Sequence, residues 1–130
     1  MYGQMGMRRL APLAVLLTAL LAACGGGGGG GGGGGSQQSA SSKPCPQGAT
    51  VIKMKDIQFH PRNASVKMGD TVCWTNEDGV QHDAVADSGA FKSALFGKGQ
   101  TFTWKADTAG TIKYVCTVHP NMTAELKVSS

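Results

Sequence analysis

The sequence from residue 45 onward predicts an all-β fold, an antiparallel sandwich of about seven or eight short strands. Short runs of alternating apolar and polar residues recur along this region and are separated by turn residues. No segment has convincing helical amphipathicity, although a short helical turn within 88–96 is compatible with the pattern. The expected strands are 50–55, 65–68, 71–75, 83–86, 101–105, 111–116 and 124–128.

Side-chain parity within these strands predicts the core, because alternate residues of a strand point to the same face. The expected inward-facing residues are Val72, Trp74, Phe102, Trp104, Ile112 and Tyr114. Cys116 shares the parity of Ile112 and Tyr114 and is therefore expected to face the core. Tyr114 stands after Gly110 and two residues before Cys116, so it is either a tyrosine corner of a Greek-key sandwich or an ordinary core tyrosine.

The first third of the chain has the composition of an export signal followed by a tether. Arg8 and Arg9 precede an apolar run over 10–23 that is too short for a membrane span and is typical of a signal peptide. The small residues before Cys24 resemble a bacterial lipobox, which predicts that Cys24 is lipidated; a soluble exported protein cut nearby is the alternative. Glycines fill 25–35, which is typical of a flexible linker.

The expected organisation is therefore a lipoprotein-type signal peptide over 1–23, a lipidated tether over 24–44 and one folded domain over 45–130. This places the domain outside the cytoplasm on a bacterial membrane, held by its lipid anchor. The formal net charge is +4, and it falls to +2 without Arg8 and Arg9. Bulk charge thus gives no support for nucleic-acid binding.

A metal site is indicated by the spacing Cys116-x-x-His119-x-x-Met122, with His82 upstream. One thiolate, two imidazoles and one thioether form a soft ligand set that suits copper. Zinc is the rival metal, but structural zinc sites use several Cys or His ligands and a thioether binds zinc poorly. With no coordination position left open for a substrate, we expect no catalytic residues and no enzyme activity.

Two further assignments account for the remaining histidine and the remaining cysteines. His60 competes with His82 as a ligand, but it precedes Pro61 and is expected to be a surface residue. With Cys24 assigned to the lipid and Cys116 to copper, Cys45 and Cys73 remain as a disulfide pair in an oxidising compartment; two free thiols are the alternative.

The residues from about 51 to 127 resemble the cupredoxins, small blue copper proteins of the plastocyanin and amicyanin kind. The matching stretches are IQFHP at 57–61, SVKMGDTVCWTN at 65–76, His82, and GTIKYVC at 110–116. The short loop from Cys116 to Met122 is most similar to that of amicyanin. This resemblance implies a Greek-key β-sandwich or barrel that binds one type 1 copper ion and carries single electrons between redox proteins.

The resemblance also implies roles for individual residues. The implied copper ligands are His82, Cys116, His119 and Met122. Asp83 and Thr117 are expected to hydrogen-bond across the site, and the family usually has Asn where this chain has Asp83. Electrons are expected to pass through the exposed edge of His119, where a redox partner docks, within an apolar patch that includes Val80, Val118 and Pro120. Copper storage or delivery by the same fold is the alternative function.

Overall fold

A computed structural model describes residues 37–130 of the chain. The expected signal peptide, Cys24 and the glycine run lie outside these residues. Within the described range, no helix has the length and apolar character needed to cross a membrane.

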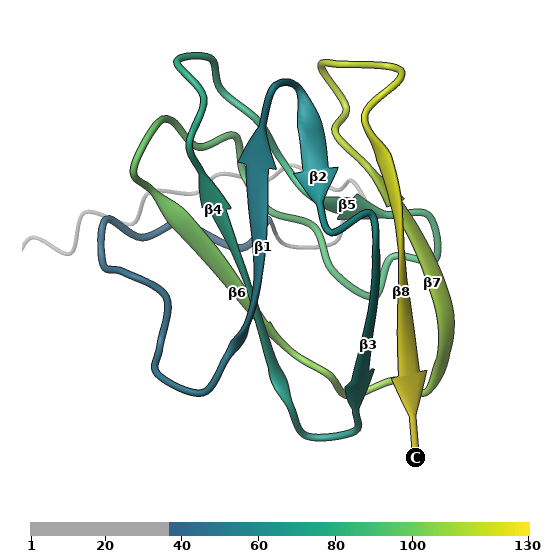
Figure 1. Cartoon of the computed structure of the whole chain (residues 1–130). Helices are drawn as coiled ribbons and strands as arrows, with labels where there is room; N and C mark the ends of the chain where they lie inside the picture. The colour runs from purple at the N-terminus through teal and green to yellow at the C-terminus, as the bar shows by residue number, and fades with distance from the viewer. Residues whose placement is uncertain (1–36) are drawn as a thin grey trace, which may run out of the picture. The chain divides into compact units, whose positions relative to one another are not determined.

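The described residues form eight strands arranged as two four-stranded sheets (Figure 1). The first sheet has the order β2-β1-β4-β6, and its strands are β1 (Thr50–Lys55), β2 (Gln58–His60), β4 (Thr71–Asn76) and β6 (Thr101–Lys105). The second has the order β3-β8-β7-β5, and its strands are β3 (Asn63–Lys67), β5 (Val85–Ala86), β7 (Gly110–Val115) and β8 (Thr123–Ser129). The all-β sandwich predicted from the sequence is confirmed.

Strand pairing is mixed, and the expectation of a purely antiparallel sandwich is wrong for two strand pairs. β1 pairs in parallel with β4, and β3 pairs in parallel with β8. Figure 1 shows the reason: β2 and β3 both run opposite to β1, and β3 lies in the other sheet, so the chain returns in β4 along the direction of β1. Such crossing between sheets is typical of Greek-key connections.

The structure adds one strand to those expected. β2 follows β1 through a tight turn in which Asp56 and Ile57 have φ angles of 55° and 56°. Two consecutive non-glycine residues with positive φ are uncommon; Asp is a common turn residue, but the β-branched Ile57 is not. The region 88–96 contains no helix but makes isolated bridges, including the pairing of His82 with Phe96.

The predicted core is confirmed, since all six expected inward-facing residues are buried. Trp74 lies at its centre, with its ring centroid 4.8 Å from that of Phe91, 5.3 Å from Phe102 and 5.7 Å from Tyr114. Removing such a buried aromatic side chain typically costs about 3–5 kcal/mol. The sheets that carry the loops at either end are therefore held by one continuous aromatic core.

Tyr114 is an ordinary core tyrosine in this structure. Its hydroxyl and the Trp74 Nε1 are the two buried side-chain polar atoms without a hydrogen-bond partner among the described residues. The backbone hydrogen bond expected of a tyrosine corner is therefore not made. Burial raises the pKa of Tyr114 above its usual value.

The N-terminal part of the described chain is attached to the sandwich by covalent and hydrogen bonds. Cys45 and Cys73 form a disulfide, which is expected to add about 3–4 kcal/mol in the chain-entropy model. Further upstream, the Ser41 N–H donates to the Thr101 carbonyl at 2.7 Å, and the Thr101 N–H donates to the Ser41 carbonyl at 2.8 Å. Gln38 forms a parallel bridge with Ser93, in which its N–H donates to the Lys92 carbonyl and its carbonyl accepts the Ala94 N–H. Gln38 and Ser41, which lie in the segment expected to be a tether, are thus part of the folded domain.

Candidate metal centre

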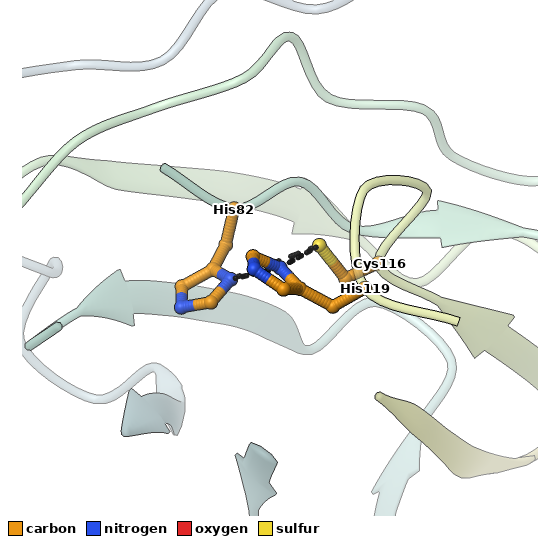
Figure 2. Close-up of side chains that lie close together, drawn as sticks. All are labelled: His82, Cys116 and His119. Carbon is orange, nitrogen blue, oxygen red and sulfur yellow. Dashed lines mark hydrogen bonds between the residues drawn. The ribbon is translucent and has the colours of Figure 1, made fainter. Parts of the chain in front are cut away.

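The candidate site lies where two loops meet at one end of the sandwich (Figure 2). His82 comes from the connection between β4 and β5, Cys116 directly follows β7, and His119 lies in the loop between β7 and β8. The Sγ atom of Cys116 and one ring nitrogen of each histidine all lie within 4.8 Å of one another. Three of the four residues expected to bind metal therefore converge on one point.

Both histidines present Nδ1 to the shared point. The Cys116 Sγ lies 3.5 Å from His119 Nδ1 and 3.7 Å from His82 Nδ1, and the two Nδ1 atoms are 3.2 Å apart. Metal–nitrogen distances of about 2.0 Å and metal–sulfur distances of about 2.3 Å place donor atoms roughly 3–4 Å from one another around a single ion. The cluster thus has the dimensions of a mononuclear site.

The loop from Cys116 to Met122 is closed by its own backbone. The Cys116 N–H donates to the Met122 carbonyl at 2.9 Å, and the Met122 N–H donates to the His119 carbonyl at 2.9 Å. The sequence supports this closure, because donors repeated at every third residue allow one tight turn to gather them. Cys116 and Met122 are each only 1% exposed, whereas His119 is partly exposed.

His82 is held on both sides. Its backbone pairs with Phe96, and its Nε2 lies 2.8 Å from the Asp78 Oδ2. The buried Asn76 side chain organises the same loop, because its Nδ2 donates to the carbonyls of Val80 and Phe96, each at 2.8 Å. Asp78 and Asn76 were not among the site residues expected from the sequence. The Asp78-Gly79 pair is typical of a turn, and nothing in it indicates a contact with His82.

Asp83 and Thr117 join the two loops of the site. The Thr117 N–H donates to Asp83 Oδ1 at 2.6 Å, and its hydroxyl donates to Oδ2 at 2.5 Å. Asp83 is buried, whereas its partner Thr117 is exposed. The segment after His82 and the residue after Cys116 are thereby held at a fixed separation.

The pKa values of Asp78, which contacts the cluster, and of Cys116, which belongs to it, shift in opposite directions. Burial alone would raise the pKa of Asp78, but hydrogen bonds from main-chain N–H groups and from His82 outweigh it and lower the pKa. Burial raises the pKa of the Cys116 thiol, against the N–H groups of Asp83 and Val118, which favour the thiolate. Without metal Cys116 is therefore a thiol, and metal binding must displace its proton.

Two other features concern the surroundings of the site. His60, the alternative ligand, is exposed and bonds to the Lys55 carbonyl at 3.1 Å, outside the cluster. Val80 lies two residues before His82 and is 46% exposed, and Val118 directly precedes His119 and is 47% exposed. Leu95, next to Phe96, is 44% exposed.

An all-β sandwich with a largely buried Cys–His–His cluster at one end defines a protein that holds a single soft metal ion. The chain belongs to the plastocyanin/azurin family of copper binding proteins, whose family model matches residues 46–129.

Individual relatives agree with this assignment. Amicyanin-alpha of Methylorubrum extorquens is 30% identical over 88 residues, which cover 64% of this chain and 74% of the relative. Plastocyanin of Scenedesmus fuscus is 38% identical over 74 residues, covering 48% of this chain and 76% of the relative. Among solved structures, the copper(I) form of an amicyanin variant has a TM-score of 0.64 at 28% identity, covering 68% of this chain and 90% of the other.

The donor chemistry fits the metal of this family. A thiol and two imidazoles at the observed spacing are the set that a type 1 copper ion requires. The chain is therefore a blue copper electron-transfer protein with one type 1 copper ion.

Proposed function

We propose that this protein is a membrane-tethered carrier that passes single electrons between redox proteins outside the cytoplasm. In this proposal the copper ligands are His82, Cys116, His119 and Met122. Copper supplies the one-electron chemistry by alternating between Cu(I) and Cu(II). The protein residues hold a ligand set that suits both states, exclude water and define the exit for the electron.

The observation that carries the proposal is the unequal burial of the cluster. His82 and Cys116 are 0% and 1% exposed, whereas His119 is partly exposed. A donor or acceptor can therefore approach the metal most closely along the His119 ring. Cys116 and His82 are held in the interior, which supports a site that keeps its geometry during electron transfer.

The surroundings of His119 support docking by another protein. Val80, Leu95 and Val118 are exposed apolar side chains on the segments that carry or pair with the histidine ligands. Exposed apolar side chains are typical of interaction surfaces when they gather in one patch. We place the partner surface here, with Leu95 as an addition to the residues suggested by the sequence.

The tether and location rest on the sequence and on the disulfide. A bond between Cys45 and Cys73 suits an oxidising compartment outside the cytoplasm. We propose that Cys24 carries the lipid and that residues 24–37 link it to the domain.

Copper storage or delivery is the second candidate, because the same ligands also bind Cu(I). A carrier of this kind must release its ion, whereas an electron carrier must retain it in both oxidation states. The closed loop over 116–122 and the Asp83–Thr117 hydrogen bonds favour retention.

Spectroscopy of the copper-loaded protein tests the proposal. We expect an intense blue Cu(II) form, rapid reversible reduction without copper loss, and loss of the blue colour in Cys116→Ser. A colourless Cu(II) form, or a blue spectrum that survives the Cys116→Ser change, would contradict the ligand assignment. Transfer of Cu(I) to a chelator of moderate affinity within the time of one redox cycle would instead support delivery.

A further inference from the structure

We infer that Asp78 is a positioning residue for His82: its carboxylate keeps the imidazole proton on Nε2 and the Nδ1 lone pair directed at the metal, and the β1–β2 turn holds that carboxylate in place. This inference rests on the proposed ligand role of His82. The inference gives the β1–β2 turn a direct part in the metal site.

The contact between the two side chains determines which ring nitrogen is protonated. The His82 Nε2 lies 2.8 Å from the Asp78 Oδ2, and a carboxylate can only accept hydrogen bonds. Nε2 therefore carries a proton, and Nδ1, which lies 3.7 Å from the Cys116 Sγ, is the nitrogen that faces the metal site. A carboxylate on the far nitrogen of a ligand histidine fixes the ring orientation and raises its basicity.

The Asp78 carboxylate is held by the main chain. Its Oδ1 accepts the Asp56 N–H at 2.8 Å, and its Oδ2 accepts the Ile57 N–H at 2.9 Å. Its own backbone N–H donates to the Asn76 Oδ1 at 2.8 Å. With both oxygens occupied and the backbone anchored, the carboxylate has little freedom to rotate away from His82.

The conformation of the β1–β2 turn is explained by this arrangement. Asp56 and Ile57 both have positive φ, a conformation that is unfavourable for a non-glycine residue unless the surrounding structure stabilises it. Their two consecutive N–H groups converge on one carboxylate, and hydrogen bonds to a charged group are stronger than those between neutral groups. The unusual turn and the Asp78 carboxylate therefore stabilise each other, and the carboxylate also contacts the His82 ring.

The carboxylate also has a predictable effect on copper. A more basic, negatively charged ligand environment stabilises Cu(II) more than Cu(I), because Cu(II) carries the higher charge. Loss of such an outer partner typically weakens metal binding by about 10–100-fold. A tenfold loss of Cu(II) affinity with unchanged Cu(I) affinity corresponds to a rise of about 59 mV in the reduction potential.

The test combines Asp78→Asn and Asp78→Ala with Asp56→Asn as a matched control. Asp56 is exposed on the same turn, makes no side-chain hydrogen bond in the structure, and loses the same charge on substitution. We expect the Cu(II)/Cu(I) equilibrium to shift at least tenfold toward Cu(I) in both Asp78 variants, and much less in Asp56→Asn. Equal shifts in Asp56→Asn and Asp78→Asn would show a general charge effect and overturn the inference.

A second measurement uses the protein without copper, so that it does not depend on the proposed function. Nitrogen-15 NMR of the ring should show His82 as the Nε2–H tautomer in the wild type and a mixture of tautomers in Asp78→Ala. An unchanged tautomer in Asp78→Ala would overturn the positioning role. Failure of the proposed function would appear separately, as a blue spectrum that survives Cys116→Ser while the tautomer result stands.

Discussion

Two carboxylates flank the candidate copper ligands, and they act on different loops. Asp78 contacts the ring of His82, whereas Asp83 accepts two hydrogen bonds from Thr117, the residue after Cys116. Both place negative charge close to the metal, where burial reduces screening by water. Each is therefore expected to favour Cu(II) and to keep the reduction potential lower than a neutral side chain would.

Replacing Asp83 by Asn is expected to raise the reduction potential while leaving the loops in place. The amide oxygen can still accept the Thr117 N–H, and the amide nitrogen can donate to the Thr117 hydroxyl, so only the charge is lost. Voltammetry of the copper protein measures the change. Asp107→Asn is the control, because it removes the same charge from an exposed residue that follows the C-terminal end of β6. A potential that is unchanged or lower in Asp83→Asn would contradict this account.

The residues of the site differ in how far the sequence could identify them. Residue type and spacing were enough for Cys116 and His119, because three residues of one tight loop must lie close together. Asp78 could not be found in this way. Its contact with His82 depends on the turn at Asp56 and Ile57, and a positive φ at the β-branched Ile57 has no local sequence signal.

Among the structural elements, the segment before Cys45 behaves least as its composition suggests. Its polar, serine-rich sequence is typical of a linker, yet Ser41 exchanges two backbone hydrogen bonds with Thr101 at the start of β6. β6 is otherwise the edge of its sheet. The pairing needs no apolar side chain, which explains why hydrophobic patterning did not reveal it, and it covers part of an edge that is prone to intermolecular pairing.

Ser41→Pro is expected to release this segment, because proline lacks the N–H that donates to Thr101. Hydrogen exchange of the Thr101 amide, which donates to the Ser41 carbonyl, should become faster by up to about tenfold, since a backbone hydrogen bond contributes about 0.5–1.5 kcal/mol. Ser39→Pro is the control, because the Ser39 N–H makes no backbone hydrogen bond in the structure. Equal exchange of Thr101 in wild type and Ser41→Pro would show that the segment is not docked in solution.

At the scale of the whole molecule, the core was the most predictable feature. Alternation along β4, β6 and β7 identified the buried aromatic and aliphatic residues because each strand has one face toward the other sheet. Parallel pairing of β1 with β4 could not be derived in the same way, since side-chain parity is the same for either strand direction. Strand direction depends on the connections between sheets, which alternation does not encode.

The buried hydroxyl of Tyr114 predicts how the stability of the molecule depends on alkaline pH. Burial raises its pKa in the folded state above the ordinary value of 10.0, so the folded protein keeps a proton that the unfolded chain releases. Stability from this group is complete below about pH 10 and is lost as pH rises above it. Relative to Tyr114→Phe, the wild type should lose stability on the order of 1 kcal/mol between pH 9 and pH 11.

Urea unfolding at the two pH values measures this difference, with both proteins in a Cys116→Ser background to remove the titration of the thiol. Lysine residues ionise in the same range but contribute equally to both proteins, so the difference isolates the hydroxyl. Tyr114→Phe also removes a buried hydroxyl that has no hydrogen-bond partner, and it retains the ring that packs on Trp74. The variant should therefore be at least as stable as the wild type at pH 9. Parallel losses of stability in the two proteins would mean that the hydroxyl reaches water in the folded state, and that the core around Trp74 is more open than the structure shows.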